Sequence, residues 1–374
     1  MAGQGIEKLR GELTVAEIRQ AILRPYAELL KNLKQVYIFG TKILGQRVCG
    51  WCEAAGIEVL GFLDNDEQRQ GQFCAGKKIF SPAHFPGGTA ALIIVASTTY
   101  QYKISQQLRT AGFHNIVSVP ILSLFDSRRF PAEAVFKNMQ EDLVSKREKY
   151  LALYESLADA QSKRVLDGLL AYRLTFDLEF LKPICELQQP EYFDRQVMPL
   201  NSEEVFVDAG GFNGDTSLQF LQAVSGHYRR IYFFEPDPGL MAAAKKNLSL
   251  AKDIVFFPLG VYSHAASLRF HPTGGLDGAL DEQGELEVKT ISLDEAVSEP
   301  VSLIKMDIEG AENAALAGAR RHLKNERPKL ALSAYHHPQD LWQLPEAIRN
   351  LNPEYRFFLR QYSLNAYETI LYAI

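Results

Sequence analysis

Cysteine is scarce in this sequence, and long apolar runs are missing from it. The 374 residues include only four cysteines, which indicates reduced thiols rather than a framework of disulfide bonds. No apolar stretch approaches the ~20 residues that a membrane-spanning helix needs. The first residues, MAGQGIEKLRGEL, lack the apolar core of a signal peptide. Together these absences predict a cytoplasmic protein that makes no contact with a membrane.

A surplus of basic residues is also absent. The chain carries 40 Lys and Arg against 45 Asp and Glu, and the two signs are well mixed. No basic stripe therefore indicates binding to nucleic acid. With 47% hydrophobic and 23% charged residues, the composition is that of a globular protein rather than a disordered one. The length is enough for about two domains.

The cysteines include one C-x-x-C pair, Cys49 and Cys52, while Cys74 and Cys185 stand alone. A redox pair is expected at the N-terminus of a helix, where the helix dipole lowers the thiol pKa. This pair instead falls about a turn into the helix that follows Gly45. A zinc site would require a second pair of ligands, and no His, Cys and carboxylate cluster elsewhere has metal-ligand spacing. We expect the thiols to fill apolar space, and we expect no metal site.

Strands and helices alternate over residues 1–120. After a helical pattern at residues 7–33, short runs rich in β-branched and aromatic residues predict strands with helices between them. This alternation predicts a parallel sheet, and hence an N-terminal Rossmann-like domain. The predicted strands are Gln35–Phe39, Ile57–Leu63, Ala90–Ala96 and Ile116–Val119.

The turn after the first of these strands leaves two interpretations open. Gly40 and Gly45 give part of a G-x-G-x-x-G pattern, and Asp64 follows the second strand at the position of a ribose-binding acid. The domain resembles the nucleotide-binding-like modules fused to sugar-modifying enzymes of bacterial glycan pathways, which implies a nucleotide-sugar ligand. The alternative is a docking or dimerisation domain with an empty crevice, and the incomplete glycine pattern favours it.

Residues 121–200 are predicted to form a helical connector. The segment is rich in charged residues, as in ADAQSKRVLDGLLAYRLTFDLEFL, and we expect this charge to form a solvated face. Pro183, Pro190 and Pro199 interrupt the helical pattern near its end. The aromatic stretch QQPEYFDRQVMPL either forms one wall of a substrate cleft or belongs to the connector alone.

A strand, a glycine-rich turn and a helix follow one another in EEVFVDAGGFNGDTS. The run Val205–Val207 predicts a buried strand that ends at Asp208, and the glycines after it let backbone N–H groups approach a nucleotide-like ligand. The next strand ends in Glu235, where an acid accepts hydrogen bonds from ribose hydroxyls. Asp208 and Asp215 on either side of the turn disfavour phosphate and favour a cationic ligand. S-adenosylmethionine fits this pattern better than NAD.

Three motifs in this half, VDAGGFNGDTS, FFEPDP and IKMDIEGAE, resemble the FkbM family of S-adenosylmethionine-dependent methyltransferases. The resemblance covers Glu203–Ile374 and includes AYHHPQDLWQLPEAI and the closing ETILYA. It implies a methyltransferase domain over residues 201–374 with S-adenosylmethionine as its cofactor. The cofactor-binding residues that we expect are Asp208, Ala209, Gly210, Gly211, Asn213, Gly214, Thr216, Glu235, Gly260 and Val261.

Polar residues follow the fourth and fifth strands of this half. The fourth strand ends at Asp307, and we expect Asp307 and Glu309 beside the reactive methyl group, although this turn could instead cap the next helix. The fifth strand leads to His336 and His337. A histidine of near-neutral pKa is a suitable base for a hydroxyl proton. We take His336 as the base and His337 as its reserve, so the predicted catalytic set is Asp307, Glu309 and His336.

The end of the chain predicts a reversed strand. Arg356–Gln361 and Thr369–Ala373 are linked by only seven residues, whereas a parallel crossover takes about a dozen or more. The two strands therefore pair antiparallel, and the resemblance implies the same reversed final strand. An earlier hairpin, Ser267–His271 with Leu286–Ser292, carries a Gly/Asp-rich loop that either covers the substrate or is a plain surface loop.

The predicted fold class is α/β, with two Rossmann-like domains joined by the helical connector, the second a class I methyltransferase-like sheet. The leading functional prediction is O-methylation of a hydroxyl on a sugar or other small molecule, in glycan or secondary-metabolite biosynthesis. Two alternatives stay open: an NAD-dependent nucleotide-sugar oxidoreductase or epimerase, and a non-catalytic module that binds S-adenosylmethionine. The sequence leaves open the acceptor, the atom that is methylated and the oligomeric state.

Overall fold

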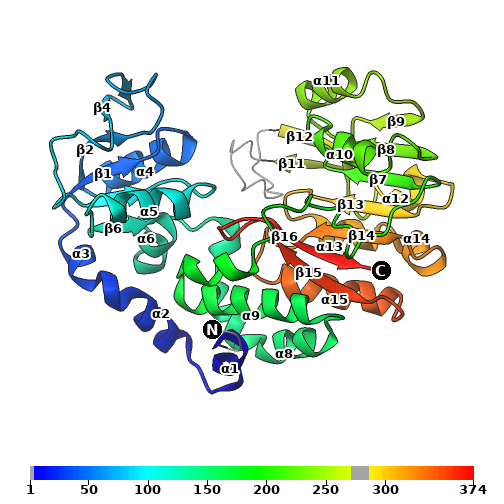
Figure 1. Cartoon of the computed structure of the whole chain (residues 1–374), viewed down its shortest axis with the longest axis horizontal. Coiled ribbons are helices and arrows are strands. Elements are labelled where there is room, and N and C mark those ends of the chain that lie inside the picture. The colour runs from blue at the N-terminus through cyan, green and yellow to red at the C-terminus, as the bar shows by residue number, and fades with distance from the viewer. Residues whose placement is uncertain (1–3, 271–285) are drawn as a thin grey trace.

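The structure, a computed structural model, describes residues 4–270 and 286–374. Two lobes, each built around a β-sheet, lie on either side of a group of helices (Figure 1). The first lobe contains a six-stranded sheet, and the second contains a seven-stranded sheet with a small three-stranded sheet beside it.

The first sheet has the order β3-β4-β2-β1-β5-β6, and every strand pair except β3–β4 is parallel. The four strands expected here are all present, so that prediction is confirmed. The edge hairpin of β3 and β4 was not predicted, because strands of two and four residues are too short to show a periodic pattern in the sequence. The elements are β1 (Gln35–Phe39), α4 (Ile43–Ala54), β2 (Glu58–Leu63), β3 (Phe73–Cys74), β4 (Lys77–Phe80), β5 (Ile93–Val95), α5 (Gln101–Thr110) and β6 (Ile116–Ser118).

Helix α4 carries the C-x-x-C pair inside its length, as expected. Both Cys49 and Cys52 are buried in the main hydrophobic core. Burial raises the pKa of Cys52 to about 12, so this thiol stays protonated at neutral pH. The pair therefore packs the first lobe as apolar residues.

Residues 7–33 are mostly helical, as predicted, but they do not form one continuous helix. The segment is divided into α1 (Gln4–Arg10), α2 (Val15–Leu23), the 3₁₀ turn η1 (Arg24–Tyr26) and α3 (Ala27–Lys31). A capping box restarts the helix at α2, since the N–H of Glu17 donates to the Thr14 hydroxyl at 3.2 Å and the N–H of Thr14 donates to the Glu17 carboxylate at 2.9 Å. Pro25 stands within η1, where a proline ends the preceding helical hydrogen bonding.

The middle segment is helical, as predicted, but part of its charge is buried rather than solvated. Asp167, on α9, accepts the backbone N–H groups of Gly5 and Ile6 at 2.9 and 2.8 Å. Arg173, also on α9, donates to the carbonyl of Pro338 at 2.7 Å. These two side chains hold α1 and the second lobe against α9. The elements are α6 (Val119–Phe125), η2 (Ala134–Phe136), α7 (Met139–Ser145), α8 (Arg147–Ser156), α9 (Ala160–Thr175), η3 (Leu178–Phe180) and η4 (Lys182–Ile184).

The second sheet has the order β15-β16-β14-β13-β7-β8-β9, and only β16 runs against its neighbours. This confirms the predicted reversal of the final strand. The strands are β7 (Val205–Ala209), β8 (Arg230–Phe234), β9 (Ile254–Phe257), β13 (Leu303–Met306), β14 (Lys329–Ser333), β15 (Phe357–Gln361) and β16 (Thr369–Ala373), and the helices are α10 (Asp215–Ala223), α11 (Pro238–Asn247), α12 (Leu293–Ala296), α13 (Glu312–Ala317), α14 (Arg320–Asn325) and α15 (Asp340–Leu351).

The small sheet beside it consists of β10 (Gly260–Val261), β12 (Leu286–Ile291) and β11 (Ala266–Phe270) in that order. Strands β11 and β12 pair antiparallel, as the predicted hairpin requires. The loop between them, which we expected either to cover the substrate or to be a plain surface loop, lies outside the described residues.

The outer edge of β15 is completed by the middle segment. The N–H of Ala158 donates to the carbonyl of Phe357 at 2.9 Å, and the N–H of Glu186 donates to the carbonyl of Gln361 at 2.8 Å. Between them, the N–H of Leu359 donates to the Ser162 hydroxyl at 2.9 Å. The backbone groups of this edge are therefore satisfied by residues that come about two hundred positions earlier.

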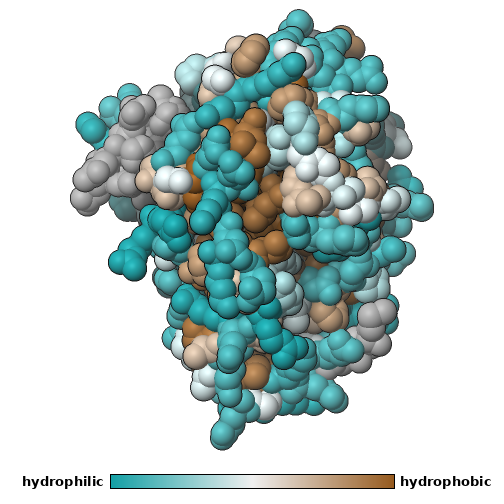
Figure 2. Space-filling view, turned by 90° about the vertical axis from the view of Figure 1, so that its left-hand side faces the viewer, coloured by the Kyte–Doolittle hydropathy of each residue, from teal (hydrophilic) through white to brown (hydrophobic). Residues whose placement is uncertain are grey.

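One large hydrophobic core contains residues of both lobes and the middle helices, and a smaller one lies on the other face of the first sheet. Side chains of β1 alternate between them, with Val36 and Ile38 in the large core and Tyr37 and Phe39 in the small one. Figure 2 shows the side of the first lobe, where hydrophilic side chains cover most of the surface and apolar ones gather near the middle. Within the described ranges, no helix combines the length and the apolar character needed to cross a membrane.

Candidate active site

A cavity of about 430 Å³ lies at the carboxyl ends of β7, β8 and β13. The sheet order places β7 between β8 and β13, and ligands of open α/β sheets bind where the strand order reverses in this way. The small sheet supplies part of the wall, which includes Val261, Leu268 and Val288. The cavity is therefore bounded by strand ends that carry polar groups and by an apolar hairpin.

The turn after β7 can approach β13 only because Gly210 has no side chain. Its φ is +73°, and a β-carbon there would lie 1.8 Å from the backbone oxygen of Asp307. The N–H groups of Gly210 and Gly211 both donate to the carbonyl of Phe234 at 3.0 Å, which ties the turn to β8 as well. The glycine turn thus locks the ends of three neighbouring strands together.

A buried ion pair supports this turn from below. Lys305, on β13, lies 3.2 Å from Asp208 on β7, and its ammonium group donates to the carbonyl of Gly210 at 2.6 Å. Ser217 donates to the other carboxylate oxygen of Asp208 at 2.7 Å. Although burial works against its charge, the carboxylates of Asp208 and Asp307 raise the pKa of Lys305, so it stays protonated. Asp208 is fully buried, which corrects the expectation that it faces the cofactor.

Glu235, directly after β8, lines the cavity as expected. It is nearly buried, and its two carboxylate oxygens accept the N–H groups of Phe212 at 3.0 Å and Asp237 at 2.8 Å. Burial raises the pKa of this carboxyl, while the two backbone donors lower it. Each oxygen keeps a further lone pair, so the fixed carboxylate can still accept hydrogen bonds from a ligand.

The structure divides the expected cofactor residues into two groups. Gly210, Glu235, Gly260 and Val261 line the cavity. The others form the strand end and the turn behind it and are not among the lining residues: Asp208, Ala209, Gly211, Asn213, Gly214 and Thr216. Phe212, which the sequence did not single out, takes their place at the rim, where its side chain is 52% exposed.

Asp307, at the end of β13, is held in the cavity by two tyrosines. Tyr192 and Tyr335 each donate a phenolic hydrogen bond to it at 3.1 Å. Although burial opposes its ionisation, the cations Lys305 and His336 lower the pKa of Asp307. It is therefore a fixed anion. Glu309 lines the same end of the cavity.

His336 does not have the near-neutral pKa that a general base needs, which corrects its expected role. Its ring is buried, with Nδ1 3.1 Å from Glu312 and Nε2 3.4 Å from Asp307. Burial alone would lower its pKa, but the carboxylates around it raise the pKa to about 10. The imidazole is therefore protonated at neutral pH. His337 lies beside Gly310, outside the lining residues, and burial lowers its pKa.

The same carboxylates form a group that the sequence spacing did not predict. Ligand atoms of Asp307, Glu312 and His336 lie within 4.8 Å of one another, so this set could hold a metal ion. Glu312 also accepts the N–H of Ile308 at 2.9 Å, which closes the turn before α13. The protonated ring of His336 already balances the negative charge here, and a metal ion would have to displace that proton.

The middle segment contributes two residues to the site that the motifs did not identify. Tyr192 reaches Asp307 from 115 positions away and adopts a left-handed backbone conformation, with φ of 67°. Burial, together with the charges of Glu368 and Asp307, raises the pKa of the neighbouring Glu191 to about 8. The aromatic composition of QQPEYFDRQVMPL was the available signal, and the structure places this stretch against the cavity end at Asp307.

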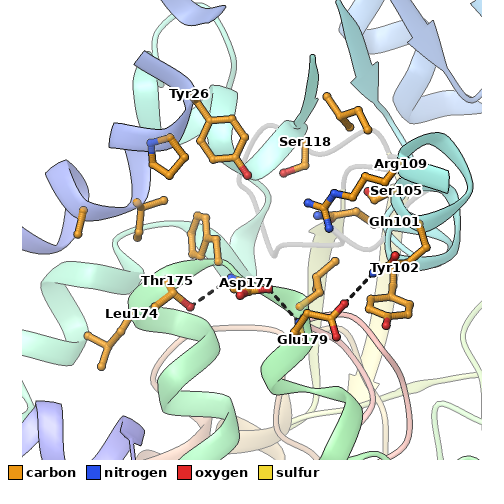
Figure 3. A pocket seen from close by; sticks show the side chains of 17 residues that line it. Tyr26, Gln101, Tyr102, Ser105, Arg109, Ser118, Leu174, Thr175, Asp177 and Glu179 are labelled. Carbon is orange, nitrogen blue, oxygen red and sulfur yellow. Dashed lines mark hydrogen bonds between the residues drawn. The ribbon is translucent and has the colours of Figure 1, made fainter. Parts of the chain in front are cut away.

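Another cavity, of about 440 Å³, lies between α5, η1 and the end of α9 (Figure 3). Its polar groups largely satisfy one another: Gln106 donates to Glu179 at 2.7 Å, and the N–H of Glu179 donates to Asp177 at 3.0 Å. Figure 3 shows Arg109 and Tyr26 pointing into the same space. This cavity lies where the first lobe, including its edge strand β6, meets the middle helices.

Comparison with known proteins agrees with this description. Residues 208–363 match the family described as the methyltransferase FkbM domain, and residues 32–116 match the family described as C2185-like, N-terminal. The 2-O-methyltransferase NoeI of Sinorhizobium fredii (strain NBRC 101917 / NGR234) is 27% identical over 191 residues, which are 43% of this chain and 76% of that protein.

Among solved structures, the methyltransferase FkbM from Methylobacillus flagellatus KT has a TM-score of 0.79 at 22% identity, covering 99% of this chain and 97% of that one. This likeness confirms the predicted α/β fold over both lobes. The match at residues 208–363 spans the glycine turn, Glu235 and Asp307. Residues 208–363 of this chain therefore match the FkbM domain of methyltransferases.

Proposed function

We propose that the protein is an S-adenosylmethionine-dependent methyltransferase that transfers the methyl group to a hydroxyl of a sugar or related small molecule. The observation that supports this most is the placement of Glu235 and Asp307 in one cavity of a methyltransferase family domain. The family finding also removes the alternative of an NAD-dependent oxidoreductase or epimerase.

The cavity fits the proposed methyl donor in size, charge and polarity. Its volume of about 430 Å³ lies in the range of small-molecule sites. The charged side chains among its described lining residues are all carboxylates, which suit a sulfonium and an ammonium and disfavour a pyrophosphate: Glu235, Asp237, Glu287, Asp307 and Glu309. Val261, Leu268 and Leu240 offer apolar contacts for a flat base.

When bound, the donor supplies a methyl group on a positively charged sulfur. Glu235 accepts hydrogen bonds from its ribose hydroxyls, each contributing about 1.5–3 kcal/mol for a charged acceptor. Asp307 accepts the hydrogen bond of the acceptor hydroxyl and aligns its oxygen with the methyl carbon. Alignment of this kind can supply about 7–11 kcal/mol of the barrier.

Methyl transfer moves one electron pair to sulfur and releases one proton from the acceptor hydroxyl. As the hydroxyl oxygen forms its bond to the methyl carbon, the carbon–sulfur bond breaks and its electron pair stays on sulfur. Methylation makes the acceptor oxygen strongly acidic, so its proton passes to Asp307 even though the pKa of that carboxyl is lowered. Tyr192 and Tyr335 fix the position of Asp307. His336, already protonated, stabilises the Asp307 carboxylate instead of acting as the base.

A sugar is the acceptor class best supported. One relative is a 2-O-methyltransferase, and carboxylates such as Asp307 and Glu309 accept hydrogen bonds from the adjacent hydroxyls of a sugar ring. The hydroxyls of Tyr192 and Tyr335 lie at the same end of the cavity and can accept further hydrogen bonds.

The test is a pair of measurements on the full chain: calorimetric binding of S-adenosylmethionine, and transfer of a labelled methyl group to a panel of sugars and nucleotide-linked sugars. We expect binding in the micromolar range and transfer to at least one acceptor. Binding without transfer to any acceptor would support the non-catalytic module instead. Absence of binding would overturn the proposal.

A further inference from the structure

The first lobe has a crevice of its own, which the methyltransferase domain does not use. A cavity of about 590 Å³ lies at the carboxyl ends of β1 and β5. The sheet order places β1 between β2 and β5, so this is again the position where the strand order reverses and where ligands of such sheets bind. The crevice is large enough for a nucleotide.

The charge of this crevice is positive where that of the methyltransferase cavity is negative. Lys42, Arg47 and Lys103 line it. Within residues 4–270 and 286–374, neither Lys42 nor Lys103 forms an ion pair. The two lining carboxylates are already engaged: Asp64 accepts the Thr41 hydroxyl and the N–H of Asp66, and Glu133 accepts the hydroxyl of Tyr367. Those donors are neutral, so the lining keeps three cations against two carboxylates, a net positive charge.

The backbone adds to this preference for an anion. Helix α4 has twelve residues, begins at the crevice and has no acidic residue in its first turn. No side chain caps its first N–H groups, which leaves them available to an anionic ligand. Asp64, after β2, stands where an acid accepts hydrogen bonds from ribose hydroxyls.

The two crevices are joined by side chains. Glu133 lines the first cavity and accepts the hydroxyl of Tyr367, which lies between β15 and β16. The ring of Tyr367 packs edge-on at 5.8 Å against Tyr335, which donates to Asp307. Two side chains, Tyr367 and Tyr335, therefore connect Glu133 in the wall of the first crevice to the Asp307 carboxylate of the second.

We propose that the first crevice binds the nucleoside diphosphate of a nucleotide-linked sugar, whose sugar extends past Tyr367 to Asp307 and is the methyl acceptor. Lys42, Lys103 and the start of α4 bind the diphosphate, and Asp64 binds the ribose. The identity of the acceptor rests on the proposed function, whereas the binding of the diphosphate does not. The charge of the crevice thus favours a ligand site over the empty docking domain that the glycine pattern alone favoured.

The first experiment measures binding alone. The full chain is titrated calorimetrically with UDP, GDP, CDP and ADP, without methyl donor, in the wild type, the double variant Lys42→Ala/Lys103→Ala and the control Lys324→Ala, an exposed lysine of the second lobe. We expect at least one diphosphate to bind, a loss of at least tenfold in the double variant and no change in the control. The inference would be overturned if none of the four diphosphates binds, or if the double variant binds them as tightly as the wild type does.

Pyrophosphate is titrated in parallel. Weaker binding than the best nucleoside diphosphate supports recognition of the nucleoside, and equal binding contradicts it. Both variants are checked for a melting temperature equal to that of the wild type, which the exposed positions of the three lysines should allow.

The second experiment separates this inference from the proposed function. Methyl transfer to the matching nucleotide-linked sugar is compared with transfer to the free sugar. We expect the double variant to raise KM for the linked sugar at least tenfold with kcat unchanged, and to leave the affinity for S-adenosylmethionine unchanged. Diphosphate binding without donor binding would overturn the proposed function alone. Donor binding and transfer without diphosphate binding would overturn this inference alone.

Discussion

The two crevices of this molecule share one construction and differ in charge. In each, a glycine of positive φ follows the central strand, Gly40 at +114° and Gly210 at +73°. In each, a β-carbon on that glycine would collide with a backbone oxygen at the end of the neighbouring strand, Ala96 at 2.6 Å and Asp307 at 1.8 Å. The backbone thus closes in the same way at both sheets.

The side chains below the two glycine turns are what differ. The register pairs Ile38 with Ile94 in the first sheet and Asp208 with Lys305 at the equivalent position of the second. Above these pairs, the first crevice presents lysines, and the second presents carboxylates. Under the two proposals, the shared backbone positions each ligand, while the side-chain charges decide whether an anion or a cation binds.

The comparison would be tested most strongly at Asp307, whose equivalent in the first crevice is Ala96. Asp307→Asn should lower the rate of methyl transfer by about 10²–10⁴-fold, because the amide cannot take the hydroxyl proton. The affinity for S-adenosylmethionine, measured by calorimetry, should change less than threefold. The matched control is Glu354→Gln, an exposed carboxylate of a surface ion pair. Full activity of Asp307→Asn would show that Asp307 does not accept the hydroxyl proton.

The buried pair under the second turn gives the next largest effect. Lys305→Met leaves Asp208 without its cation and should reduce the free energy of unfolding by about 3–5 kcal/mol. At the equivalent position in the first sheet, Ile94→Met conserves volume and should cost less than about 1.5 kcal/mol. Urea denaturation measures both. Equal losses in the two variants would mean that the ion pair has no special role.

Glu235 and Asp64 follow equivalent strands of the two sheets. Substituting each by alanine tests whether only Glu235 contributes to binding of S-adenosylmethionine. Glu235→Ala should weaken S-adenosylmethionine binding at least about tenfold, since one charged hydrogen-bond acceptor contributes about 1.5–3 kcal/mol. Asp64→Ala, in the first crevice, should leave that affinity unchanged. Calorimetry on the full chain measures the affinity of both variants for S-adenosylmethionine. An unchanged affinity in Glu235→Ala would show that the ribose is held elsewhere.

The smallest effect concerns the buried imidazolium of the second crevice. The pKa of His336 is raised to about 10 in the folded protein, above its value of about 6.5 in an unfolded chain. Its contribution to stability is therefore complete below pH 6.5 and is lost as the pH rises through 10.

The measurement is urea denaturation of the wild type and His336→Gln at pH 7 and pH 10. The difference in free energy of unfolding between the two proteins should shrink by at least about 1.4 kcal/mol, the equivalent of one pKa unit. Taking the difference removes the other groups that titrate in this range. A difference that stays constant with pH would contradict the assigned charge.

Most of the fold and part of the site follow from the sequence, for different reasons. Strands such as β7 and β13 consist of consecutive buried residues, and the rule that ligands bind at strand ends then selects Glu235 and Asp307. The pairing of Lys305 with Asp208 depends on register between strands 97 residues apart, which no local pattern encodes.

The electrostatic state of the site is equally non-local. From the sequence alone, His336 is expected to have an ordinary pKa. The fold brings Glu312 and Asp307 next to its ring. Tyr192 reaches the site through an irregular segment whose left-handed backbone no periodicity predicts. The strands and the polar residues at their ends are therefore predictable here, whereas the protonation states depend on residues that only the folded chain brings together.

The way in which β15 is finished by the middle segment has a practical consequence. Strand edges with unsatisfied N–H and C=O groups recruit other chains and lead to aggregation. A truncated protein beginning at residue 201 would expose the carbonyls of Phe357 and Gln361, which the full chain pairs with Ala158 and Glu186. The C-terminal half therefore depends on the middle segment for its solubility. Insolubility or inactivity of such a fragment would reflect the exposed edge of β15 rather than the loss of a catalytic residue.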